Sequence, residues 1–181
     1  MIDANEQVVL CDSHGQPLGL AGKLDAHRNG QLHLAVSVFL FDRQGRVLLQ
    51  KRQAGKYHSP GQWANTCCSH PRADESPLAC AQRRLQEEMG ISCALIGLFQ
   101  LLYKADAGNG LIEHEYVHCF AGNFEGDASP DPREVSDWRW AKLDELVEAA
   151  RAHPQDYAPW LHIYLDRRRE QIAAAAQRAS M

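Results

Sequence analysis

The sequence has little net charge, no long hydrophobic run and no CxxC cysteine pair. A formal charge of −4 over 181 residues gives no overall field that would indicate a nucleic-acid or membrane partner. No apolar run approaches the length that crosses a bilayer, and the acidic start at residues 1–6 lacks the apolar core of a secretory signal. Six cysteines without CxxC spacing argue against a zinc ribbon and indicate reduced thiols. We therefore expect a cytosolic protein; nothing in the sequence indicates an oligomeric state.

Periodic apolar residues and turn signals predict an α/β (α+β) chain with mixed strands flanked by helices. Strand–turn–strand patterns span residues 6–20 and 34–50, and each turn ends in a glycine. Further strands are expected at 91–99 and 110–120, and helices at 141–150 and 161–176.

One helix has clear boundaries in the sequence. Ser76 is suited to cap it, Pro77 fits its first turn, and Gly90 ends it. No linker is visible, so we expect one domain over residues 1–181. Its core would span about 6–165, followed by a solvated helical or frayed tail at about 166–181.

The segment from Ser69 to Ile91 resembles the Nudix box. That pattern is Gly, five residues, Glu, seven residues, then Arg-Glu-apolar-any-Glu-Glu-any-Gly-apolar, and the spacing matches throughout. Glu87 and Glu88 would offer oxygen ligands to Mg²⁺, which could bridge the protein to a diphosphate. Arg84 stands where the first Glu of Arg-Glu belongs, so a carboxylate that a Nudix hydrolase would use is replaced by a cation. Taken alone, the motif is also compatible with ordinary solvated ion pairs on a charged helix.

The segment Trp63-Ala64-Asn65-Thr66-Cys67-Cys68-Ser69-His70-Pro71 resembles the cysteine motif of type I isopentenyl-diphosphate isomerases. That motif is Trp, any, Asn, two residues, Cys, a small residue and His-Pro, so Cys68 holds the matching place and Cys67 does not. The likeness extends from about Val8 to Trp160. It implies a Nudix-like fold and an enzyme of isoprenoid biosynthesis that interconverts isopentenyl diphosphate and dimethylallyl diphosphate.

The resemblance also implies roles for individual residues. The implied metal ligands are His27, His33, His70, Glu113 and Glu115, with Glu88 near a Mg²⁺ linked to the diphosphate. The implied catalytic residues are Cys68, Glu115, Tyr103 and Trp160. The implied substrate-binding residues are Lys23, Arg52, Lys56, Arg84 and Cys68. The loop between His27 and His33 is one residue shorter than in enterobacterial members.

The chemistry of these residue types is consistent with the implied roles. Glu113 and Glu115 are two apart on an expected strand, so their carboxylates lie on one face. Three imidazoles and two carboxylates favour six-coordinate Mn²⁺, Mg²⁺ or Fe²⁺, and Zn²⁺ would also fit. The remaining histidines are expected to be surface or packing residues: His14, His58, His114, His118, His153 and His162.

Moving the double bond requires protonation of the alkene and loss of a proton from the neighbouring carbon. The site needs an acid and a base on opposite faces of the substrate, in surroundings that exclude water and tolerate a carbocation. Cys68 and Glu115 are the expected pair, with Tyr103 as proton partner of Glu115 and the indole of Trp160 facing the cation. Which of the pair gives the proton stays open.

Two alternatives to an isomerase remain. A Nudix hydrolase of nucleoside or other organic diphosphates would share the fold and the Mg²⁺, although Arg84 and the set of Cys68, Glu115 and Trp160 argue against it. A non-catalytic metal- or RNA-binding module would have lost catalytic residues, yet every matched residue is present. The sequence also lacks the basic–aromatic stripe on which RNA bases stack.

Overall fold

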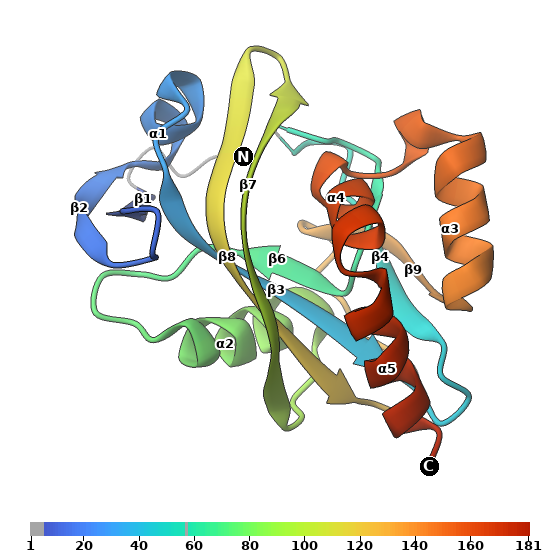
Figure 1. Ribbon diagram of the computed structural model, residues 1–181. Coiled ribbons are helices and arrows are strands. Elements are labelled where there is room, and N and C mark those ends of the chain that lie inside the picture. Colours follow the sequence, from blue (N-terminus) through green and yellow to red (C-terminus); the bar gives the residue numbers. More distant parts are fainter. Residues whose placement is uncertain (1–5, 57) are drawn as a thin grey trace.

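The computed structural model describes residues 6–56 and 58–181 as a mixed sheet with helices on both faces (Figure 1). The strands are β1 (Gln7–Cys11), β2 (Pro17–Gly22), β3 (His33–Phe41), β4 (Val47–Arg52), β5 (Trp63–Ala64), β6 (Cys67–Ser69), β7 (Leu95–Gly108), β8 (Leu111–Asn123) and β9 (Val135–Ala141). The helices are α1 (Lys23–Asn29), α2 (Pro77–Met89), α3 (Leu143–Ala152), α4 (Pro159–Arg167) and α5 (Arg169–Ala179), with a 3₁₀ turn at Pro154–Asp156. Residues 1–5, part of the start that argued against a secretory signal, lie outside the described residues. No helix within the described ranges is long and apolar enough to cross a membrane.

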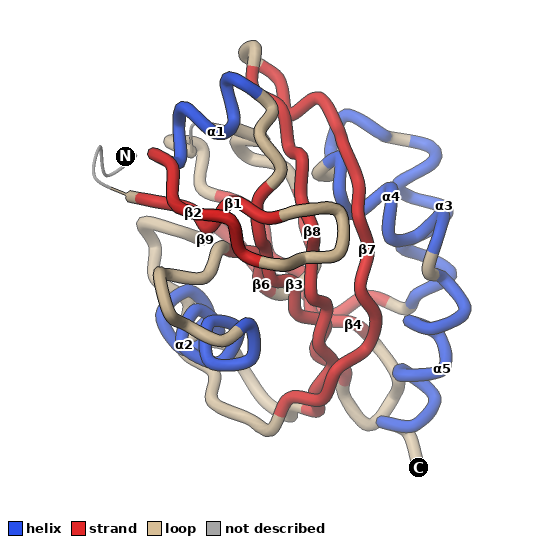
Figure 2. The backbone as a smooth tube through the Cα atoms, turned by 60° about the vertical axis from the view of Figure 1, so that its left-hand side comes forward, coloured by secondary structure: helices blue, strands red, loops and turns tan. Residues whose placement is uncertain are grey.

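Strand β3 is the centre of the structure, and all nine of its residues are buried. Helix α2 covers one face of the sheet and α3, α4 and α5 cover the other (Figure 2). Alternate residues of β3 therefore belong to two cores: Val36, Val38 and Leu40 pack with α2, and Ala35, Phe39 and Phe41 with the C-terminal helices. A strand covered on both faces is apolar at nearly every position, as this one is.

The pairing of β3 determines which segments meet at the site. β8 runs parallel to β3 from the pair His33–Glu115 to the pair Phe41–Asn123. The short strand β6 pairs antiparallel with β3, with Cys68 opposite Ser37. β7 and β8 form a long antiparallel hairpin, drawn as the tall yellow and olive ribbons of Figure 1. Residues far apart in the chain are thereby brought to one end of β3.

Helix α2 has the boundaries that the sequence predicts. The Ser76 side chain accepts a hydrogen bond from the Ala79 amide at 3.2 Å, and Pro77 is the first helical residue. Gly90 ends the helix at φ 69°, and a Cβ there would lie 2.5 Å from the carbonyl oxygen of Ser129. Both predicted hairpin turns are also present, closed by Gly15 and Gly45.

Other elements differ from the sequence prediction. The seven-residue helix α1 and the strand β9 were not expected, and β7 begins and ends later than the predicted strand at 91–99. The expected helix at 161–176 is two helices separated at Arg168. The sequence suggested a solvated tail, but α5 packs on the sheet and its Ile172 is fully buried. The small side chains of its alanines allow close packing against the core.

Candidate active site and metal centre

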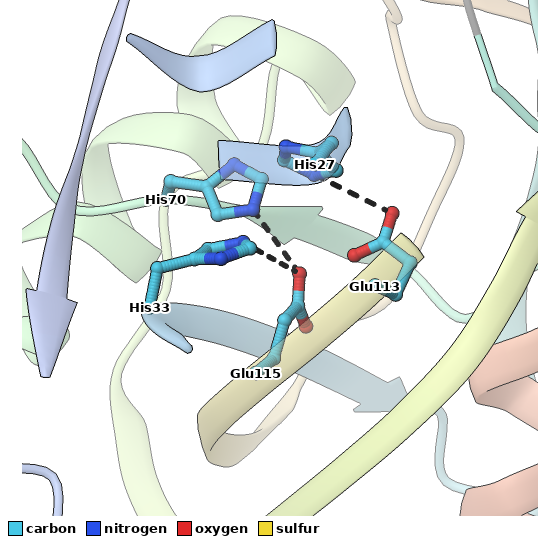
Figure 3. A group of neighbouring side chains, drawn as sticks. All are labelled: His27, His33, His70, Glu113 and Glu115. Carbon is cyan, nitrogen blue, oxygen red and sulfur yellow. Dashed lines mark hydrogen bonds and ion pairs between the residues drawn. The ribbon is translucent and has the colours of Figure 1, made fainter. Parts of the chain in front are cut away.

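Five side chains expected to bind metal lie together at one end of β3 (Figure 3). His27, His33, His70, Glu113 and Glu115 each offer a ligand atom, and these atoms all lie within 4.8 Å of one another. His70 Nε2 is 3.1 Å from Glu115 Oε1, and His33 Nε2 is 3.8 Å from the same oxygen. His27 Nε2 lies 3.8 Å from Glu113 Oε1.

The ligand set comes from four separate elements. His27 lies on α1 and His33 is the first residue of β3. Glu113 and Glu115 project from the same face of β8, and His70 follows β6 directly. The parallel pairing of β3 with β8 places His33 opposite Glu115, which the sequence spacing alone could not indicate.

The orientation of the rings fits a cation at the centre. His27 Nδ1 donates to the Lys23 carbonyl at 2.6 Å, and His33 Nδ1 donates to the Gln31 carbonyl at 2.8 Å. Because a carbonyl can only accept, these contacts leave each Nε2 with its lone pair facing the cluster. The Nε2 of His33 is buried and has no hydrogen-bond partner among the described residues.

Burial controls the charge of this cluster. It lowers the pKa values of His27 and His33, and lowers that of His70 well below its usual value. Burial also raises the pKa of Glu113, with the charge of Glu115 adding to the effect, and it raises the pKa of Glu115. Neutral imidazoles beside two carboxylates that resist ionisation form a site that positive charge would stabilise. The donor set therefore fits a divalent metal ion.

Cys68 faces the pocket next to this cluster, whereas Cys67 is fully buried among apolar residues on the α2 side. The two thiols face opposite sides because side chains alternate along a strand. Cys68 Sγ is 3.2 Å from Ser37 Oγ and donates to Asn65 Oδ1 at 3.3 Å. Asn65 is held in turn by Ser37 and the Val38 carbonyl, which explains the Asn of the motif. Burial raises the pKa of Cys68 to about 12, so its thiol is protonated at neutral pH.

Glu115 has a second partner on its other side. The Tyr103 hydroxyl donates to Glu115 Oε2 at 2.6 Å, across the β7–β8 ladder where the two residues are directly paired. Tyr103 is only 2% exposed, and burial together with the Glu115 charge raises its pKa well above the usual value. The phenol therefore keeps its proton and donates a hydrogen bond to the carboxyl group.

The four expected diphosphate-binding cations surround the same pocket. Lys23 pairs with Glu6 at 3.0 Å, and Arg52 lies against the Trp160 ring with its guanidinium carbon 5.2 Å from the ring centroid. Arg84 and Lys56 lie on the α2 side of the pocket. Arg84 forms ion pairs with Glu88 and Glu134, and Lys56 forms one with Glu134.

Glu88 is separate from the five-residue cluster. Arg84 donates to Glu88 Oε1 at 2.6 Å, and Gln50 donates to Glu88 Oε2 at 3.3 Å. Glu134 contacts both Lys56 and Arg84, and the contact to Arg84 is 3.6 Å. The Arg84–Glu88 pair lies at the pocket and is mostly buried, so it is not an ordinary solvated helix pair.

One pocket brings these groups together. The empty space within it, including open solvent at its mouth, is about 480 Å³. All the expected catalytic and substrate-binding residues line it: Lys23, Arg52, Lys56, Cys68, Arg84, Tyr103, Glu115 and Trp160. Among the expected metal ligands, His27 and His33 lie behind this lining and the others form part of it.

The comparisons with known proteins agree with this geometry. The family model described as "NUDIX domain" matches residues 31–162. The chain is similar to "Isopentenyl-diphosphate Delta-isomerase 2" of Aromatoleum aromaticum, with 49% identity covering 90% of this chain and 86% of the relative. It is 44% identical to "Isopentenyl-diphosphate Delta-isomerase" of Burkholderia multivorans, covering 90% and 92%. The chain belongs to the type I isopentenyl-diphosphate isomerase family.

The fold of this chain is shared with other solved structures. The structure of DR0079 from Deinococcus radiodurans superposes with a TM-score of 0.71 at 14% identity, covering 97% of this chain and 100% of that chain. The MutT protein of Methanosarcina mazei gives 0.59 at 16% identity, covering 83% and 96%. These likenesses concern the fold alone. The family and the fold class predicted from the sequence are thus confirmed.

Two residues that the family motifs did not single out also belong to the pocket region. His58 was expected to be a surface or packing residue, but it is only 6% exposed and lines the pocket. Its Nε2 lies 3.4 Å from Glu113 Oε1. Glu134 follows α2 by more than forty residues and meets Lys56 and Arg84 only in the folded chain. No sequence signal identifies either residue, because each acts through neighbours from other elements.

Proposed function

We propose that this protein interconverts isopentenyl diphosphate and dimethylallyl diphosphate. The observation that supports this most is the pairing, in one small pocket, of a protonated thiol with a carboxyl–phenol pair. Cys68 belongs to β6 and Glu115 to β8, and β3 runs between these two strands. A substrate in the pocket would therefore have proton-transferring groups supplied from either side of β3.

The proposed reaction has two proton transfers. Addition of a proton to the terminal alkene carbon produces a tertiary carbocation, and loss of a proton from the carbon next to the diphosphate-bearing one produces dimethylallyl diphosphate. One of Cys68 and Glu115 gives the first proton and the other receives the second, so the number of protons in the site is unchanged. Tyr103 shares its proton with Glu115 and can adjust to either charge state of that carboxyl group.

The intermediate cation needs stabilisation without a nucleophile. The Trp160 indole is 3% exposed and lines the pocket, so its π face can stabilise positive charge while its bulk excludes water. Water in contact with the cation would add to it and form an alcohol. A dry, aromatic surface at this position favours proton loss instead.

We propose that the residues His27, His33, His70, Glu113 and Glu115 hold a divalent ion, Mn²⁺ or Mg²⁺, with Zn²⁺ also able to bind such a set. The ion would supply positive charge that neutralises the buried carboxylates and increases the acidity of a Glu115 carboxyl group. The imidazoles would orient both glutamates, and the backbone carbonyls at Lys23 and Gln31 fix the rings of His27 and His33.

We propose that Lys23, Arg52, Lys56 and Arg84 bind the diphosphate, assisted by Mg²⁺ near Glu88. Arg84 also supports isomerisation over hydrolysis, because it replaces a carboxylate of the Nudix box with a phosphate-binding cation. The six cysteines are all free thiols, which supports a cytoplasmic location. The proposed partner is the small-molecule substrate alone.

The test is ¹H NMR of isopentenyl diphosphate with the pure protein and Mg²⁺ in D₂O. We expect dimethylallyl diphosphate to appear with deuterium incorporated from solvent. A Cys68→Ala variant should form product at least about 10²-fold more slowly while retaining its metal, because the thiol is outside the ligand set. Unchanged substrate in the presence of metal-loaded wild-type protein would refute the function, and phosphate release from a nucleoside diphosphate panel would identify a hydrolase.

A further inference from the structure

His58 lies between the metal cluster and the diphosphate-binding side of the pocket. Its Nε2 is 3.4 Å from Glu113 Oε1, and its Nδ1 is 3.5 Å from Nη2 of Arg52. Its ring packs edge-on to the Trp160 indole with centroids 5.8 Å apart, and stacks on His27 at 5.7 Å. One side chain thus contacts a proposed metal ligand, a proposed phosphate-binding arginine and the proposed cation-stabilising indole.

The tautomer of His58 follows from the chemistry of its neighbours. A guanidinium has only donors, so the ring nitrogen facing Arg52, Nδ1, acts as an acceptor. In the neutral ring the proton is then on Nε2, which points to the Glu113 carboxyl group. The imidazole therefore accepts from Arg52 and faces the Glu113 carboxyl group with its Nε2–H, and this polarity favours one orientation of the Glu113 carboxyl group.

Arg52 also holds the backbone on which His58 is placed. Its Nε donates to the Ser59 carbonyl at 3.2 Å and its Nη2 to the His58 carbonyl at 3.2 Å. Ser59 has a positive φ of 47°, a conformation that favours glycine and that persists here within this hydrogen-bonded turn. The position of the His58 ring is thus set by the same arginine that lines the pocket.

We propose that His58 is a positioning residue that connects Arg52 to the metal ligand Glu113 and holds the Trp160 indole against the pocket. The proposal rests on the proposed function for the roles of Arg52 and Trp160, but its contact with the metal cluster can be tested without substrate. Hydrogen-bond partners of metal ligands orient those ligands, and their loss typically weakens metal binding or activity about 10–100-fold. We expect a loss of this size when His58 is truncated.

The experiment is a Mn²⁺ titration of metal-free protein, followed calorimetrically, for the wild type and three variants. His58→Ala should weaken Mn²⁺ binding about 10–100-fold. His58→Gln should restore binding to within about threefold of the wild type, because its amide can donate to Glu113 and accept from Arg52. His118→Ala is the matched control: this half-buried histidine on β8 contacts Gln100 and does not line the pocket.

The same variants are then assayed for turnover. His58→Ala should lower kcat about 10–100-fold, with a smaller change in KM, and His58→Gln should recover most of kcat. Equal Mn²⁺ affinity of His58→Ala and wild type would overturn the proposal, as would equal weakening in His118→Ala. A His58→Gln variant as impaired as His58→Ala would also overturn it, because the donor and acceptor roles would then be irrelevant.

The two proposals can fail separately. Weakened Mn²⁺ binding in His58→Ala, with rescue in His58→Gln, would support the role of His58 even if the wild type did not convert isopentenyl diphosphate. Thermal melting of each variant shows whether it is folded, and a His58→Ala variant that does not fold leaves His58→Gln as the deciding comparison. An unfolded alanine variant together with a glutamine variant of tenfold weaker affinity would overturn the proposal.

Discussion

Replacing Tyr103 by Phe removes one hydroxyl group from the site and leaves its shape unchanged. That hydroxyl is buried and donates to Glu115 Oε2 at 2.6 Å, while Oε1 keeps its contacts with His70 and His33. A buried hydrogen bond to a charged group contributes about 1.5–3 kcal/mol. If it is strongest when Glu115 changes its protonation state, its loss lowers kcat by about 10–150-fold. KM should change little, because the phenol is not among the cations expected to bind the diphosphate.

The assay is initial-rate conversion of isopentenyl diphosphate, with metal content measured on the same samples. Tyr157→Phe is the control, since Tyr157 is equally buried but its hydroxyl accepts from Arg139 outside the pocket. Tyr103→Phe with wild-type kcat would refute the idea that the phenol assists Glu115. A variant that loses its metal together with its activity would instead show that Tyr103 acts by holding the ligand set.

Three further predictions concern catalysis and stability. Cys68→Ala should lower turnover at least about 10²-fold with unchanged metal content, and a variant keeping a tenth of wild-type activity would contradict the role of the thiol. Gly90→Ala should lower the free energy of unfolding by about 2–4 kcal/mol, measured by chemical denaturation, because it adds a Cβ at positive φ next to the Ser129 carbonyl. A loss below about 0.5 kcal/mol would contradict this. Glu75→Gln should cost about 1–2 kcal/mol at pH 7, since the hydrogen bonds from Arg83 lower the pKa of Glu75 from 4.5 to about 2. That stabilisation is present above pH 4.5 and is lost as the pH falls towards 2, so the difference between wild type and variant should shrink over this window; a constant difference would refute the assignment.

Arg84, which stands in place of a Nudix-box carboxylate, contacts three carboxylates in the folded chain. The guanidinium donates to Glu87 at 2.7 Å and to Glu88 at 2.6 Å, and also lies near Glu134. Three carboxylates thus contact one cation in the lining of a pocket proposed to bind diphosphate. Where the Nudix box of a hydrolase has a carboxylate, this chain thus has a positively charged side chain that lines the pocket.

The sequence by itself determined the local features whose causes are local. The Ser76 cap, Pro77 and the αL glycine at position 90 define helix α2, because capping and φ preferences act within a few residues. Alternation along the strand predicted at 110–120 puts Glu113 and Glu115 on the same face. The family motifs then indicated five metal-binding side chains, which the structure brings within reach of one another.

Only the tertiary structure decided which distant segments meet. The register of β3 against β8 places His33 opposite Glu115, and that register depends on packing both faces of β3 against separate helical layers. Helix α1 has only seven residues, too few to be stable alone, so it exists only because the fold supports it. His58 lines the pocket, and Glu134 contacts Lys56 and Arg84 in its lining. These contacts are with side chains from other elements, so no periodicity or motif in the sequence indicates them. Helix caps and strand faces depend on residues close together in the sequence, so short stretches of sequence determine them. The geometry of a site that several elements form depends instead on how the core packs.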